Sequence, residues 1–127
     1  MRVLIDTNRL TDCLRRHEAT IKLVERAREV WVPFVTMAEI KAGFVGGKLS
    51  EHNELLLRQF LQKPGVAVLY PNRETSDYYA RLFNQLRKAG TPIPTNDLWI
   101  ASLSVQHELA LITRDSHFEK LPQLVYA

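Results

Sequence analysis

Short β-rich runs alternate with longer helical segments along this 127-residue chain, and this alternation restricts the possible fold more than any other feature. Four apolar, largely β-branched runs have the length of strands, at 2–5, 30–35, 66–69 and 109–113. Segments with helical spacing of apolar residues separate them. Strands joined by helices form parallel sheets covered on both faces. The sequence therefore predicts an α/β fold, a three-layer α/β/α sandwich around a mostly parallel sheet, as one domain over residues 1–127.

The boundaries of the helices follow from caps and breakers. Helices are expected at 8–17, 19–28, 36–44, 50–62, 74–89 and 97–107, and a further short strand at 123–126. The segment Thr36 to Glu39 has the pattern of a capping box, which predicts Thr36 as the N-cap of its helix. Pro33 favours a strand end or a sheet edge, because proline cannot donate to the ladder.

Composition excludes several classes of protein. Apolar residues make up 46% and charged residues 24%, as in globular chains. No apolar run reaches the length of a membrane span, and the N-terminus MRVLID lacks the layout of a signal peptide. The single cysteine, Cys13, cannot form an internal disulfide, which favours the reducing cytoplasm, and a packing role is expected for it.

Four acids at element junctions are the candidate catalytic residues. Asp6 and Asp115 follow short apolar strands, and Glu39 and Asp97 each lie near the start of a predicted helix. Each acid has a simpler interpretation as a helix cap or as a partner of the helix dipole. Parallel strands, however, gather their carboxyl ends at one edge of the sheet, where α/β folds bind ligands. One crevice can therefore hold all four.

Four carboxylates in one crevice repel one another, and a divalent cation removes that repulsion. Oxygen ligands suit Mg²⁺ or Mn²⁺, whereas zinc sites need clustered His or Cys, and the four histidines here are scattered along the sequence. We expect Asp6, Asp97 and Asp115 to be the metal ligands. Glu39 is expected to bind a second metal or to accept a proton from the attacking water.

Polar neighbours of these acids have candidate supporting roles. Asn8 and Thr113 each lie two residues from a proposed ligand, where an amide or a hydroxyl can orient a carboxylate, although local turn geometry explains them equally well. The net charge is +3, and without the four proposed ligands only ten acids oppose 17 basic residues, which favours a nucleic-acid substrate. Arg9, Lys41 and Arg114 are the candidate substrate-binding cations, with plain surface exposure as the alternative.

Four segments of the sequence resemble the PIN domain, and specifically the VapC toxin family of type II toxin–antitoxin systems. They occur in the family's order: LIDTN at 4–8, TMAEIKAG at 36–43, IPTNDLWIAS at 93–102 and ALITRDSHFEKLP at 110–122. The resemblance implies an Mg²⁺- or Mn²⁺-dependent endoribonuclease that forms a homodimer and is neutralised by a cognate antitoxin. It also implies roles for particular residues. The acidic quartet is matched by Asp6, Glu39, Asp97 and Asp115, and the family's supporting polar positions by Asn8 and Thr113.

Other functions remain compatible with parts of this pattern. A haloacid dehalogenase-like phosphatase would have a second Asp at position 8, where this chain has Asn8. A receiver-like signalling module would have adjacent acids after the first strand, and a non-catalytic RNA-binding domain would not need the intact quartet. The apolar faces near Phe44, Leu56 and Phe60 can pack in the core, form a dimer interface or receive an amphipathic antitoxin helix.

Overall fold

A computed structural model describes residues 1–127 and contains a four-stranded, wholly parallel sheet with strand order β3-β2-β1-β4. The strands are β1 (Arg2–Ile5), β2 (Glu29–Pro33), β3 (Val66–Leu69) and β4 (Ala110–Ile112). Leu4 in the inner strand β1 lies opposite Trp31 on one side and Leu111 on the other. The register therefore brings the ends of β1 and β4 side by side, although more than a hundred residues separate them.

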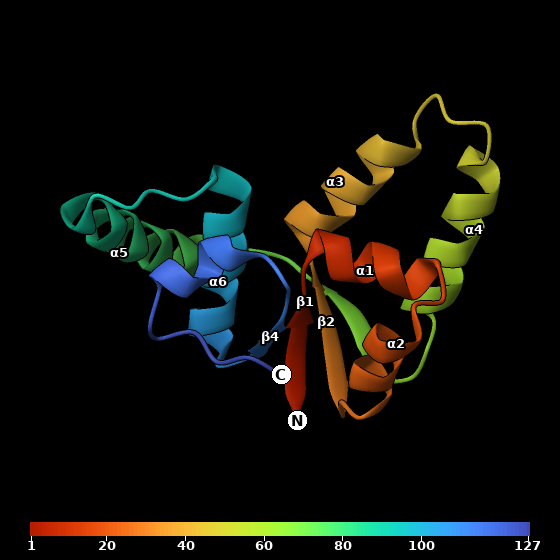
Figure 1. Ribbon diagram of the computed structural model, residues 1–127, viewed down its shortest axis with the longest axis horizontal. Helices are drawn as coiled ribbons and strands as arrows, with labels where there is room; N and C mark the ends of the chain where they lie inside the picture. The colour runs from red at the N-terminus through yellow and green to blue at the C-terminus, as the bar shows by residue number, and fades with distance from the viewer.

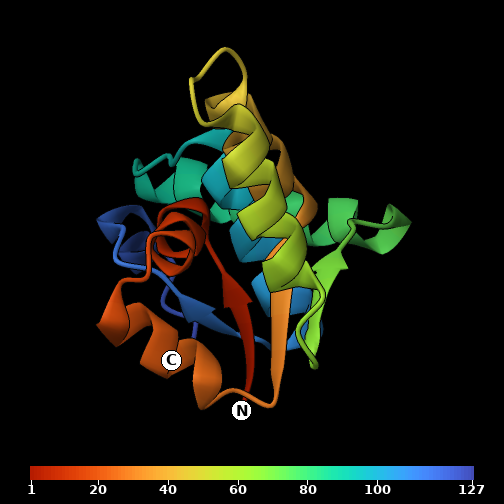
Figure 2. The same cartoon turned by 90° about the vertical axis from the view of Figure 1, so that its right-hand side faces the viewer.

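Helices cover both faces of the sheet, as Figures 1 and 2 show. They are α1 (Thr7–Leu14), α2 (Glu18–Glu25), α3 (Phe34–Phe44), α4 (Ser50–Leu61), α5 (Arg73–Ala89), α6 (Thr95–His107) and the 3₁₀ helix η1 (Ser116–Lys120). Leu4 and Leu111 pack with α5, α6 and η1, whereas Val3 and Ile5 pack with α1, α3 and α4. Successive residues of a strand point to opposite faces, so both faces are buried. The predicted three-layer sandwich is confirmed.

The start of α3 differs from the prediction. The helix begins at Phe34 with Pro33 as its N-cap, so Thr36 lies inside it and the capping-box interpretation is wrong. Proline suits this junction because its backbone, at φ −60° and ψ 143°, is still extended, while it lacks the N–H that would continue the ladder. Pro33 therefore marks the end of a strand that is internal to the sheet. Glu39, which has no capping role, is free to face the end of β1.

The C-terminal segment also differs from the prediction. No strand forms at 123–126; a single parallel bridge joins Tyr126 to Leu111. The other helices agree with the expected ones within a few residues, and Gly90 ends α5 in the left-handed conformation at φ 71°. None of the helices is both long and apolar enough to cross a membrane. Burial raises the pKa of the Cys13 thiol to about 11, in keeping with a packing role.

Candidate metal and catalytic site

Asp6 stands at the junction of β1 and α1, where the first strand reaches the carboxyl edge of the sheet. Its side chain is only 4% exposed. One carboxylate oxygen accepts the backbone N–H of Arg9 at 3.0 Å, so Asp6 is the N-cap of α1, and the other accepts the hydroxyl of Thr113. Burial raises the pKa of Asp6, and the nearby Asp115 carboxylate raises it further, while these two hydrogen bonds oppose the shift. The carboxyl group is held in a fixed orientation at a site that disfavours its charge.

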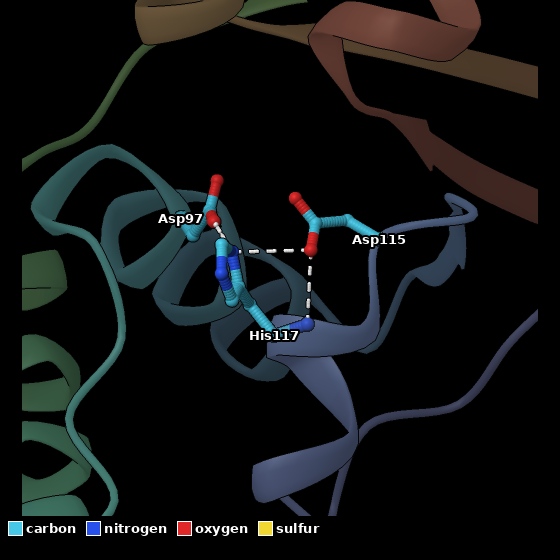
Figure 3. A group of neighbouring side chains, drawn as sticks. All are labelled: Asp97, Asp115 and His117. Atoms are coloured by element: carbon cyan, nitrogen blue, oxygen red, sulfur yellow. Dashed lines mark hydrogen bonds and ion pairs between the residues drawn. The ribbon is translucent and has the colours of Figure 1, made fainter.

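Asp97, Asp115 and His117 form a compact group, as Figure 3 shows. Asp6 lies within electrostatic range of this group through Asp115. Asp97 lies in the first turn of α6, and Asp115 caps η1 by accepting the backbone N–H of His117 at 2.9 Å. The His117 Nδ1 atom is 2.9 Å from Asp97 Oδ2 and 3.1 Å from Asp115 Oδ1. One potential ligand atom from each residue lies within 4.8 Å of the other two. Three donor groups from two separate elements thus converge on one point.

The pKa of Asp97 links the four acids electrostatically. Burial raises this pKa, and the negative charges of Asp115 and Glu39 raise it further, against the opposing effect of the His117 hydrogen bond. Asp115 raises the pKa of Asp6 as well. Asp115 therefore acts on both Asp6 and Asp97, and Glu39 acts on Asp97, so the four acids that the sequence singled out form one electrostatically coupled group. The surface that these four residues form is called the hollow.

Glu39 faces this hollow from α3 and is positioned by a residue that the sequence reasoning missed. The hydroxyl of Thr7 in α1 donates to Glu39 Oε1 at 2.7 Å. This hydrogen bond ties the exposed Glu39 side chain to the residue that directly follows Asp6. The second oxygen, Oε2, makes no hydrogen bond within the chain. The donor set as a whole consists of four carboxylates, two of which, Asp6 and Asp97, have raised pKa values, and it fits a divalent cation.

The PIN-domain family matches residues 3–124 of the sequence. The chain belongs to the PIN-domain family. Ribonuclease VapC1 of Haemophilus influenzae strain R2866 is 30% identical over 127 residues, covering 95% of this chain and 92% of that protein. Ribonuclease VapC2 of Rickettsia felis is 25% identical, covering 96% and 93%. The family resemblance is confirmed.

Solved structures agree with this assignment of the chain to the PIN domains. The structure of VapBC-1 from nontypeable Haemophilus influenzae has a TM-score of 0.86 and 28% identity, covering 100% of this chain and 97% of that one. VapBC2 from Rickettsia felis, bound to a DNA fragment from its promoter, has a TM-score of 0.87 at 24% identity, covering 100% and 98%. The similarity to the Rickettsia felis structure supports the fold of this chain. Membership of the family displaces the phosphatase and receiver interpretations.

The predicted substrate-binding cations of this PIN domain all have carboxylate partners within the chain. Arg114 makes a two-pronged ion pair with Asp12 at 2.6 and 3.1 Å, and Arg9 Nη1 lies 3.7 Å from the same carboxylate. Lys41 pairs with Glu54 at 3.1 Å. The sequence reasoning missed Asp12, which shows no pattern in the sequence. Its ion pair anchors the loop between Thr113 and Asp115 to α1.

Two predicted supporting residues of the PIN domain have different surroundings. Thr113 donates to Asp6 and accepts the backbone N–H of Asp115 at 3.0 Å, so it connects two of the acids. Asn8 is exposed, and no hydrogen bond joins its amide to Asp6 or Asp115. His117, one of the four histidines that are scattered along the sequence, faces two acids. The short spacing of Asp115 and His117, which follow the last strand, is the only signal in the sequence that points to it.

Burial of Asp6 gives this PIN domain a defined pH dependence without metal. Because the pKa of Asp6 in the folded chain is raised above its ordinary value of 3.8, the folded chain holds the proton more tightly than the unfolded chain. The associated stability is fully present below pH 3.8 and is lost as the pH rises through the folded pKa. Asp6→Asn, which stays neutral and can still cap α1, is expected to stabilise the metal-free protein at neutral pH.

Urea unfolding in EDTA at pH 7 and near pH 4 measures this difference in the free energy of unfolding. The increase in the free energy of unfolding caused by Asp6→Asn should be larger at pH 7 and should become smaller toward pH 4. Asp77→Asn, at an exposed position on α5, is the matched control and should show no such trend. A variant that is less stable than the wild type at pH 7 would contradict the prediction.

Proposed function

We propose that this PIN domain is a metal-dependent endoribonuclease, the toxin of a toxin–antitoxin pair, and that it hydrolyses RNA phosphodiester bonds at the four acids. The convergence of Asp6, Glu39, Asp97 and Asp115 at one sheet edge carries the proposal. The 30% identity to a protein named ribonuclease VapC1 supports it. Phosphodiester hydrolysis needs a cation to offset negative charge, and this hollow is built from cation ligands.

Asp6, Asp97 and Asp115 are proposed to hold Mg²⁺ or Mn²⁺, which when bound lowers the pKa of a water and stabilises charge on the phosphate. The chain's own groups do the rest. Thr113 and the Arg9 backbone fix both oxygens of Asp6, so that this carboxylate keeps one orientation. Thr7 holds Glu39 Oε1 and leaves Oε2 to accept a proton from the attacking water. Asn8 is exposed and is proposed to keep a supporting role, in which its amide hydrogen-bonds a water at the site and orients it.

Incubation of the purified protein with single-stranded and structured RNA tests this function. Cleavage is expected with Mg²⁺ or Mn²⁺ and is expected to stop in EDTA, because the four carboxylates add negative charge and the nearby cations Arg9, Lys41 and Arg114 already have carboxylate partners. Asp97→Asn protein, purified in parallel, controls for a contaminating nuclease. Cleavage by the wild type that persists in EDTA would rule out the metal mechanism.

The substrate's negative charge agrees with the chain's net charge of +3. Arg9, Lys41 and Arg114 are proposed to contact RNA phosphates from the rim of the hollow, and Arg114 is half exposed although it is paired with Asp12. A cation that already has a carboxylate partner contributes less to phosphate binding than a free one. Substitution of any of these three cations should therefore lower RNA affinity by a smaller factor than the factor by which substitution of one of the four acids lowers the cleavage rate.

A cognate antitoxin is the proposed protein partner, and the fold offers a groove for it. Relatives of this chain were solved as the VapBC assemblies named above. A groove of about 470 Å³ lies between α2 and α4, and nine of its 15 lining residues are hydrophobic. Leu56 and Phe60 line it, whereas Phe44 borders a separate hollow beside Glu39. We place an apolar antitoxin segment in the groove. Exposed Phe34, Tyr70 and Phe83 provide apolar surface for the proposed homodimer.

Leu56→Asp is expected to weaken antitoxin binding by about 30-fold or more, because a charge would replace an apolar side chain that lines the groove. RNA cleavage in the absence of antitoxin should be kept, since Leu56 lies away from the four acids. Leu55→Asp, on the same helix but 43% exposed and outside the groove, is the matched control. Titration of each variant with the protein encoded by the adjacent gene measures both affinities. Equal affinities for the two variants would exclude this groove.

A further inference from the structure

His117 contacts two of the four acids, although the proposed roles of the acids do not require a histidine there. Its Nδ1 atom is 2.9 Å from Asp97 Oδ2 and 3.1 Å from Asp115 Oδ1, so a single ring nitrogen faces two carboxylates (Figure 3). The position of the ring is built locally. The backbone N–H of His117 donates to Asp115 Oδ1 at 2.9 Å, which turns the chain so that the imidazole lies back over that carboxylate.

The separations of these atoms are those of ligands around one ion. An octahedral cation with bonds of about 2.1 Å has neighbouring ligand atoms about 3.0 Å apart. The two distances from the His117 nitrogen agree with that spacing, and the three atoms lie within 4.8 Å of one another. A proton on Nδ1 can also hold this geometry by hydrogen bonding, so the distances alone permit both an ion pair and a metal site.

The anchoring of the group favours ligation. Asp97 lies in the first turn of α6, and Asp115 is held by capping η1 and by its N–H, which donates to the Thr113 hydroxyl. Phe118, the next residue after His117, is fully buried and holds η1 against the sheet. All three donors are therefore pre-positioned on anchored backbone, as a metal site requires.

Resting on the proposed function, we infer that His117 is a ligand of the catalytic cation through Nδ1, and that this nitrogen biases the site toward Mn²⁺ over Mg²⁺. Mg²⁺ takes oxygen ligands almost exclusively, whereas first-row transition ions accept imidazole, and Mn²⁺ is also well suited to carboxylates. The two-carboxylate, one-imidazole donor set of Asp97, Asp115 and His117 therefore matches Mn²⁺ better than four carboxylates alone would.

Pulsed electron paramagnetic resonance of the full chain loaded with Mn²⁺ tests this directly, because a coordinated imidazole nitrogen modulates the signal. The wild type should show the nitrogen modulation, and His117→Gln should lose it. Calorimetric titration with MnCl₂ and with MgCl₂ gives the second readout. His117→Gln is expected to weaken Mn²⁺ binding by about 10- to 100-fold and to weaken Mg²⁺ binding much less. His52→Gln, at an exposed site on α4, is the matched control.

The possible outcomes separate the inference from the proposed function. If the wild type binds both ions but shows no nitrogen modulation, or if His117→Gln binds both at least as tightly, His117 is only an ion-pair partner and the inference is wrong. If the wild type binds neither ion, both the metal mechanism and the inference are wrong. Circular dichroism of His117→Gln and of a second variant, His117→Asn, establishes that a lost signal reflects lost ligation in a folded chain.

Discussion

Asp97→Asn is expected to lower metal-dependent RNA cleavage by about a thousandfold or more, because a cation contributes several kcal/mol to the transition state. The carboxylate is replaced by a neutral amide of the same shape, so one proposed ligand loses its charge. The hydrogen bond to His117 can persist in the variant, and the apolar body of α6 is unchanged. The fold should therefore survive while the chemistry is lost.

Single-turnover cleavage rates at saturating Mg²⁺ or Mn²⁺ measure the effect of this substitution, and circular dichroism verifies the fold. Asp77→Asn removes the same charge from an exposed position on α5 and is the matched control. It should cleave at the wild-type rate. If Asp97→Asn cleaved RNA at the wild-type rate, Asp97 would not be a catalytic residue. If both variants lost the same fraction of the cleavage rate, the effect would be a general one of charge.

Phe118→Ala is expected to destabilise the protein by about 3–5 kcal/mol, because the ring is fully buried and its removal leaves a cavity. The ring packs in the core cluster that contains Leu4 and Leu111, on the α5 and α6 side of the sheet. It also directly follows His117. The variant should therefore bind Mn²⁺ more weakly even under conditions in which it remains folded, because η1 loses its anchor.

Urea unfolding in EDTA measures the stability of this variant, and calorimetry at a temperature well below its melting point measures Mn²⁺ binding. Phe83→Ala, at a ring that is 50% exposed on α5, is the matched control and should cost about 0.5 kcal/mol or less. A similar loss of stability in the two variants would show that Phe118 does not anchor η1.

The sequence predicted the strand ends that position the acids, because the patterns that mark a strand and its end lie within a few residues of one another. Strand β1 has the predicted boundaries, and an acid that follows an apolar run of strand length can be assigned to the sheet edge from the order of residues alone. The start of α3 was misplaced because Pro33 acts as both strand end and helix cap, whereas the Thr36 to Glu39 pattern suggested a later start. Local patterns compete at such junctions, and packing decides between them.

The parts of the site that depend on long-range contacts could not be predicted in the same way. Arg114 and Asp12 are 102 positions apart, and nothing in either neighbourhood specifies the pair. His117 faces Asp97 across 20 positions. Only the parallel pairing of β4 with β1 brings the segment after residue 112 to the end of the first strand. His117, which is isolated from the other histidines in the sequence, therefore lies beside two acids in the fold.

The shared ion pair on Asp12 has a consequence for the order of events in a catalytic cycle. Arg9 and Arg114 both pair with Asp12, and of the two only Arg9 acts on one of the four acids, by lowering the pKa of Asp6. Most of the negative charge of the four acids is therefore left without a cation. A strand of RNA that arrived first would meet unbalanced negative charge. We therefore expect sequential kinetics, with ion uptake preceding capture of the nucleic acid. The apparent rate of RNA association should then rise with divalent ion concentration until the hollow is saturated.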